Sequence, residues 1–138
     1  MSVERGGNLM QLNYECIRAL LLYFEDNLRV DSHGLPKGLK VKNIDLEKEF
    51  PQFSQEEIYY NIRKLVEAGY IKVRKNDVAP RIMIVDEITL AGHEFLDASK
   101  NSSNWKKAME FVKSKGGGIT LDVLKALLIQ LAKDLLLK

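Results

Sequence analysis

Cysteine is nearly absent from this sequence, and so are long apolar runs. Cys16 is the only cysteine among 138 residues, which excludes an intramolecular disulfide and a cysteine-based metal site. A free thiol within an apolar helical pattern is typical of a reducing compartment, so we expect a cytoplasmic protein. Residues 1–12 lack the apolar core of a signal peptide, and no apolar run approaches membrane-spanning length. The sequence therefore predicts no association with a membrane.

A large excess of one charge is also missing. The chain carries 21 Lys and Arg against 19 Asp and Glu, a net charge of +2. Because dedicated nucleic-acid binders are usually more basic, an argument for DNA depends on where the charges lie. The apolar content of 46% is typical of a folded globular chain. We expect a loose lead-in over residues 1–9, a domain over 10–100 and a C-terminal helical segment over 101–138.

The residue patterns that carry enzyme chemistry are lacking too. The sequence has no phosphate-cradling glycine loop, no nucleophile paired with a base and no cluster of metal ligands. The GHEFLD stretch around His93 fails the zinc-protease helix motif, because Asp97 stands where the second histidine should be. We expect Gly92 to allow close helix packing and His93 to lie at the surface. The prediction is a non-enzymatic protein with no metal, no cofactor and no small-molecule substrate.

Apolar residues at helical spacing predict a first helix over 10–27, which the glycines and proline of DSHGLPKG end. A short helix capped by Asn43 and running to Phe50 follows, and an extended strand is the alternative for this stretch. The next helix has a stronger N-terminal signal than the short helix before it. Ser54 to Glu57 form a capping box, with flanking apolar residues as a hydrophobic staple, and Gly69 is placed to end that helix.

Alternation of apolar and polar residues follows directly. Residues 70–75 and 81–85 predict the two strands of a hairpin around a turn that contains Pro80. Three more helices are expected after the hairpin, because residues that favour helix N-caps precede apolar stretches. The expected caps are Thr89, then Ser102 or Ser103, then Thr120.

The order of these elements predicts an α+β fold, a winged helix-turn-helix with additional C-terminal helices. In that fold the helix beginning at Ser54 is the recognition helix, and the hairpin over residues 70–85 is the wing.

The stretches MQLNYECIRALLLYFEDN, SQEEIYYNIRKLVEAGYI, ITLAGHEFLDASKNSSNWKKA and ITLDVLKALL resemble an uncharacterised family of small bacterial and prophage proteins. The resemblance covers nearly everything from Met10 onward. Its most specific part is TLAGHEFLDA, Thr89 to Ala98, followed closely by Trp105. The resemblance implies a winged-helix fold and a bacterial or prophage setting, and it brings no catalytic residues. DNA binding is then expected by analogy with the fold.

Basic residues gather on the expected recognition helix and wing. From Arg63 to Arg81 there are six basic and two acidic residues, a local net charge of +4. Basic side chains beside a groove-sized helix can contact phosphates, while Gln and Arg can contact base edges. The candidate nucleic-acid-binding residues are Gln55, Tyr60, Arg63, Lys64, Lys72, Arg74, Lys75 and Arg81.

Two ordinary roles compete with this interpretation. The outer face of the helix also carries Glu56, Glu57 and Glu67, as a solvated surface helix would. Basic residues on an exposed strand can simply prevent edge-to-edge pairing. The leading hypothesis is a DNA-binding bacterial or prophage regulator with double-stranded DNA as its partner. The alternative is a protein–protein adaptor that uses a winged-helix scaffold without binding nucleic acid.

The last predicted helix has more leucine than one buried stripe requires. Such an apolar helix lies either deep among other helices or against a second subunit. The sequence therefore predicts a homo-oligomer, a dimer in the simplest case. The expected interface residues are Leu121, Leu124, Leu128, Leu131 and Leu135.

Overall fold

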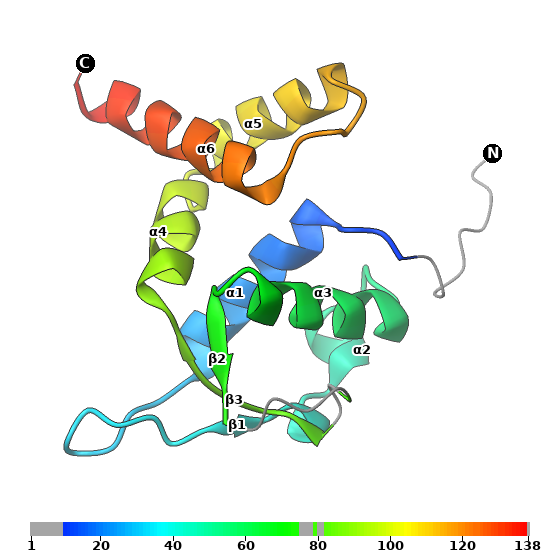
Figure 1. Cartoon of the computed structure of the whole chain (residues 1–138), viewed down its shortest axis with the longest axis vertical. Helices are drawn as coiled ribbons and strands as arrows, with labels where there is room; N and C mark the ends of the chain where they lie inside the picture. The colour runs from blue at the N-terminus through cyan, green and yellow to red at the C-terminus, as the bar shows by residue number, and fades with distance from the viewer. Residues whose placement is uncertain (1–9, 75–78, 80–81, 138) are drawn as a thin grey trace. The chain divides into compact units, whose positions relative to one another are not determined.

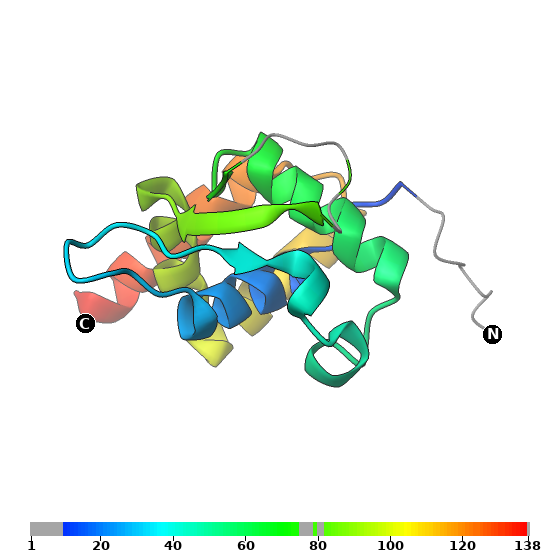
Figure 2. The same ribbon diagram turned by 90° about the horizontal axis from the view of Figure 1, so that it is seen from below.

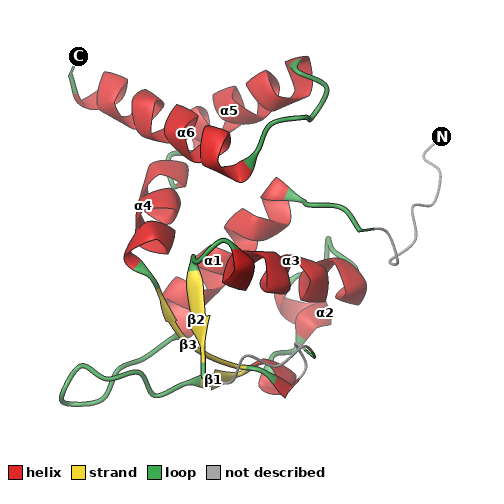
Figure 3. Cartoon of the chain, in the orientation of Figure 1, coloured by secondary structure: helices red, strands yellow, loops and turns green. Residues whose placement is uncertain are grey.

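The computed structural model describes residues 10–74, 79 and 82–137 of the chain. Over these residues it has six α-helices and one three-stranded antiparallel sheet (Figures 1 and 3). The expected α+β class is confirmed at this level. The chain divides into two compact units, Met1–Gly92 and His93–Lys138, and the division falls inside the fourth helix. The sequence places its boundary later, after residue 100.

The first unit contains three helices, the sheet and the beginning of the fourth helix. In chain order the elements are α1 (Tyr14–Asn27), β1 (Leu39–Lys40), the 3-10 turn η1 (Val41–Asn43), α2 (Leu46–Glu49), α3 (Gln55–Glu67), β2 (Ile71–Val73) and β3 (Ile84–Ile88). The strand order is β1-β3-β2, so β3 is the central strand (Figure 2). Helix α1 packs against α3 and β3, and this layer forms the core.

Helix α1 begins later than its apolar pattern predicts. The side chain of Asn13 accepts a hydrogen bond from the backbone N–H of Cys16, which sets the first turn at Tyr14. Met10 lies outside the helix and is 83% exposed, so its place in the apolar pattern does not correspond to burial. Leu28, which the pattern also includes, lies just past the end of the helix and is half-buried, and the buried face is centred on Ile17, Leu20, Leu21 and Phe24 as predicted. Its members are Cys16, Ile17, Leu20, Leu21 and Phe24.

The segment between α1 and α3 differs most from the prediction. Strand β1 pairs with β3 at the start of the stretch that the sequence leaves open between helix and strand, and the Val41 N–H donates to the Met83 carbonyl at 3.0 Å. The short helix is capped by Asp45 instead of Asn43. The reason is physical: β1 is held by a strand more than forty residues later, so local propensity cannot reveal it. Phe50 is buried as expected.

Helix α3 confirms the predicted capping box. The Glu57 N–H donates to Ser54 Oγ at 3.1 Å, and the Ser54 N–H donates to Glu57 Oε1 at 3.2 Å. Ile58 and Ile62 are buried on its inner face. Gly69 follows the helix with a φ of +77°, the left-handed conformation that only glycine adopts without strain. The chain then enters β2 directly.

The predicted hairpin pairing is confirmed where the structure describes it. Strand β2 is antiparallel to β3, with Lys72 opposite Glu87 and Val73 opposite Val85. The register therefore skips Asp86, which makes a β-bulge. Strand β3 also continues to Ile88, three residues beyond its predicted end. Lys75 and Arg81 lie outside the described residues.

The TLAG stretch fixes the beginning of α4 (Leu90–Ser99) to the turn after α3. Thr89 N–H donates to the Tyr70 carbonyl at 2.9 Å, and its hydroxyl donates to the Gly69 carbonyl at 2.5 Å. The Gly92 N–H in turn donates to Thr89 Oγ, which confirms Thr89 as the cap. A Cβ on Gly92 would lie well inside contact distance of the Tyr70 carbonyl oxygen. The expected close packing at Gly92 is thus confirmed.

The second unit contains the rest of α4, α5 (Ser102–Ser114) and α6 (Leu121–Leu136). Asn101 caps α5, accepting from the Asn104 N–H at 2.9 Å, so the predicted serine cap is wrong by one or two residues. Thr120 caps α6 as predicted. Helices α5 and α6 pack together, and the Phe95 and Trp105 rings meet edge to face at 6.5 Å. No helix in the described residues is long and apolar enough to cross a membrane.

Candidate nucleic-acid interface

The outer face of α3 carries charges of both signs. Gln55, Glu56 and Arg63 are exposed, as predicted for residues that could meet a ligand. Among the residues that the structure describes, no carboxylate forms an ion pair with Arg63. The Arg63 guanidinium is therefore the charge on this helix that is most available to a phosphate.

Lys64 is engaged on its own helix. Its Nζ lies 3.0 Å from Glu67 Oε2 and 5.2 Å from the centre of the Tyr60 ring. The hydrogen bond to Glu67 raises the pKa of the Lys64 ammonium above its usual value. Tyr60 is half-buried, and its ring stays next to this cation. An exposed pair of this kind contributes little to stability, but it offsets the positive charge that a phosphate would meet.

Glu57 points away from this face, which corrects the sequence-based placement. Its Oε2 accepts a hydrogen bond from Asn13 Nδ2 of α1 at 2.9 Å, and its Oε1 accepts from the Ser54 N–H. The side chain is half-buried between the beginnings of two helices. The reason is that the capping box already turns the carboxylate back toward the helix N-terminus, where Asn13 lies. The outer face of α3 is therefore less acidic than the sequence indicates.

The hairpin, in contrast, is less basic than the sequence indicates. Arg74 Nη2 forms a 2.8 Å ion pair with Asp86 Oδ1, and Lys72 stands opposite Glu87. Both carboxylates belong to β3 and come after the Arg63–Arg81 segment in which the net charge of +4 is counted. The Arg74 side chain also lies over Gly38, where an added Cβ would come within 2.7 Å of Nη2. The Arg74 side chain thus lies between Asp86 of β3 and Gly38, the residue before β1.

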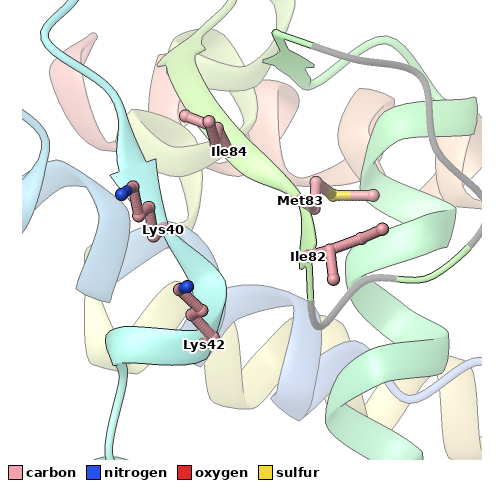
Figure 4. A pocket seen from close by; sticks show the side chains of 5 residues that line it. All are labelled: Lys40, Lys42, Ile82, Met83 and Ile84. Carbon is pink, nitrogen blue, oxygen red and sulfur yellow. The ribbon is translucent and has the colours of Figure 1, made fainter.

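Two lysines that the sequence interpretation omitted lie at the other edge of the sheet. Lys40 ends β1 and Lys42 lies in η1; both are exposed. Together with Ile82, Met83 and Ile84 they line a pocket of 130 Å³ (Figure 4). The signal for them was the LKVKN stretch, which carries two lysines two residues apart directly after the loop.

The expected oligomer residues in α6 differ in exposure. Leu124 and Leu128 are buried in the chain itself, and Leu121 and Leu131 are half-buried. Leu135 is 55% exposed, and the two leucines that follow it are more than 80% exposed. An interface with a second copy therefore remains a prediction, and the exposed leucines at the end of the helix are the ones available for it.

Cys16 is the free thiol, and it is buried in α1. Burial, with a smaller contribution from the nearby Glu57 carboxylate, raises the pKa of this thiol to about 12. A thiol of that pKa is a poor nucleophile at neutral pH. Within the described part of the chain no group of three or more His, Cys, Asp or Glu residues could hold a metal ion.

Comparison with known proteins gives a relative and a family for the chain. An uncharacterised protein of Haemophilus influenzae is 28% identical over 117 residues, which cover 84% of this chain and 90% of that protein. No solved structure matches the chain. A family model described as hypothetical protein (DUF2513) matches residues 11–118. Since that match spans most of the sequence, the chain belongs to the DUF2513 family of hypothetical proteins.

Proposed function

We propose that the chain is a winged-helix protein that binds double-stranded DNA and acts as a bacterial or prophage regulator. The element order α1-β1-α2-α3-β2-β3 with β3 central supports the winged-helix assignment. In this proposal α3 is the recognition helix and the β2–β3 hairpin is the wing. The protein is cytoplasmic and not an enzyme.

The observation that carries the proposal is the position of Arg63. It is exposed on a 13-residue helix, and no described carboxylate forms an ion pair with it. Gln55 is exposed at the beginning of the same helix. At such positions an arginine can neutralise a backbone phosphate, and a glutamine can form paired hydrogen bonds with an adenine edge.

A salt titration with mixed-sequence duplex tests the proposal. Binding that neutralises phosphates weakens as salt rises, and log affinity falls linearly with log salt. We expect measurable binding at low salt with a clearly negative slope, and Arg63→Gln should make that slope shallower by roughly 0.9. Equal slopes for wild type and Arg63→Gln would contradict a phosphate contact by Arg63, and wild-type protein that fails to bind duplex at low salt would contradict DNA as the partner.

The alternative, a protein–protein adaptor on the same scaffold, is favoured by one set of contacts. Lys64 and Arg74 are both paired with carboxylates at 3.0 Å or less. Surfaces with both signs interspersed discriminate between protein partners well and attract a polyanion poorly. An adaptor predicts little affinity for duplex at moderate salt and no response to Arg63→Gln.

A further inference from the structure

Two lysines, Lys40 at the end of β1 and Lys42 in η1, lie at the same end of the sheet as Arg74. Lys40 stands opposite Ile84 in the register, and the Val41 N–H donates to the Met83 carbonyl at 3.0 Å. On the other side of β3, the Arg74 N–H donates to the Ile84 carbonyl at 2.9 Å. Ile84 therefore lies between the end of β2 and the end of β1, and the backbones of Arg74 and Lys40 flank it.

These lysines differ from two of the basic residues that the sequence singled out. Lys64 and Arg74 each have a carboxylate within 3.0 Å, whereas no ion pair involves Lys40 or Lys42 in the part of the chain that the structure describes. Both side chains are exposed. A cation without a carboxylate partner contributes its full charge to a polyanion, and a paired one must first give up its partner.

The pocket beside the lysines limits what can bind there. Its volume of 130 Å³ is well below the roughly 300–1,000 Å³ of pockets that enclose a small molecule. Figure 4 shows Lys40 and Lys42 on one side of the pocket and Ile82, Met83 and Ile84 on the other. Ile82 is 58% exposed. A site of this size with two cations on one side suits the charged groups of a larger polyanion better than an enclosed small molecule.

We infer that Lys40 and Lys42 contact backbone phosphates of duplex DNA and extend its binding surface across the sheet from the hairpin to β1. This inference rests on the proposed function, and it specifies which cations supply the electrostatic attraction. Phosphate contacts of this kind position a protein on the duplex without reading its sequence. The loss of these two lysines should therefore weaken binding to all sequences alike.

The test is the salt dependence of duplex binding by the full chain carrying Lys40→Gln and Lys42→Gln. Each phosphate contact contributes roughly 0.9 to the slope, so the double variant should be shallower than wild type by nearly twice that amount. The matched control is Arg29→Gln with Lys37→Gln. These two exposed cations belong to the loop that extends from the opposite end of β1 (Figure 2), and their removal should leave the slope unchanged.

Two further results distinguish a failure of this inference from a failure of the proposed function. Lys40→Arg with Lys42→Arg keeps both charges and should retain the wild-type slope, and a urea midpoint of the glutamine pair equal to wild type excludes misfolding as the cause of a loss. Wild-type binding with equal slopes for the glutamine pair and the control pair would overturn the inference alone. Wild-type protein that fails to bind duplex at low salt would overturn the proposed function, and this inference with it.

Discussion

Glu57 in α3 accepts a 2.9 Å hydrogen bond from the side-chain amide of Asn13, the residue that caps α1, 44 positions earlier in the chain. The same carboxylate closes the capping box with Ser54, so one side chain serves the beginnings of two helices. The buried Asn61 completes the contact, since its Oδ1 accepts from the Asn13 N–H at 3.1 Å. The N-termini of α1 and α3 are thereby held together by polar contacts inside an otherwise apolar layer.

Glu57→Ala should therefore cost more stability than loss of the cap alone. Ser54→Ala removes one capping hydrogen bond and should lower the free energy of unfolding by about 1 kcal/mol. Glu57→Ala also leaves Asn13 Nδ2 without its acceptor and should cost about 2 kcal/mol, measured by urea denaturation. Glu56→Gln, on the exposed neighbour, is the control and should stay within about 0.5 kcal/mol of wild type.

A double-mutant cycle on Asn13 and Glu57 isolates the link between the helices. We expect a coupling energy of roughly 1 kcal/mol, because the two side chains are in direct contact. Additive effects of Asn13→Ala and Glu57→Ala would show that the contact contributes nothing to stability.

The capping box was predictable from four consecutive residues, but its second partner was not. Ser54 and Glu57 lie within one turn, so local spacing reveals their contact. Asn13 meets Glu57 only through the packing of α1 on α3, and no local pattern contains that information. The same holds for β1, which depends on pairing with β3. Local signals therefore predicted most helix positions and the hairpin pairing, and missed what tertiary contacts decide.

At the candidate interface, too, local patterns predicted the exposure of side chains but not their tertiary contacts. The exposure of Gln55 and Arg63 follows from helical periodicity and was predicted. The pairing of Arg74 with Asp86 depends on a bulge in the strand register, which shifts a carboxylate by one position. The net charge of a sequence segment therefore does not reveal that Asp86 neutralises Arg74.

Gly92→Ala should be strongly destabilising. The added Cβ would collide with the Tyr70 carbonyl, which is backbone and cannot move without disturbing the Thr89 N–H that it binds. Overpacking of this kind costs typically 1–3 kcal/mol. Gly118→Ala is the matched control, because the nearest atom to its Cβ would lie at 4.0 Å. Equal thermal midpoints for the two variants would contradict the close packing at TLAG.

The Cys16 thiol should be inert in the folded protein. Its pKa is raised from 9.0 to about 12, so at pH 8 the thiolate fraction falls by about a thousandfold relative to an unfolded chain. Labelling with a thiol reagent should be slow in buffer and fast in denaturing urea. Rapid labelling of folded protein would show that α1 does not bury this side chain.

The raised pKa of Cys16 also predicts that the stability of the protein depends on pH. The pKa of the Cys16 thiol is higher in the folded protein than in the unfolded chain. The contribution of the neutral thiol to the free energy of unfolding is therefore complete below pH 9 and is lost as pH rises toward about 12. Burial also raises the pKa of Tyr14 and Tyr23, which lose stabilisation in the same direction at alkaline pH. A Cys16→Ala variant should therefore lose less stability between pH 9 and 12 than wild type. Parallel curves for the two proteins would contradict the assignment.

Asp86→Asn tests how much the Arg74 ion pair restrains DNA binding. If duplex DNA is the partner, removal of this carboxylate frees Arg74 for a phosphate and should steepen the slope of log affinity against log salt by up to about 0.9. Asp26→Asn removes the same charge from the exposed end of α1 and is the control. Equal slopes for the two variants would show that Arg74 makes no phosphate contact even when it is free.

Self-association through α6 is the last prediction. Leu135, Leu136 and Leu137 are 55%, 83% and 85% exposed, in an unbroken row at the end of the helix. Burying one leucine is worth roughly 1.5–3 kcal/mol, and 1.4 kcal/mol is a factor of ten in affinity, so one lost contact should weaken a dimer at least about tenfold. Leu135→Lys with Leu136→Lys should therefore give monomer at concentrations where wild type is dimeric. Gln130→Lys adds charge to an exposed position of the same helix without removing a leucine, and it should leave the dimer intact. Sedimentation of wild type as a monomer at high concentration would contradict the prediction, because it would show that these leucines stay exposed to solvent in the stable protein.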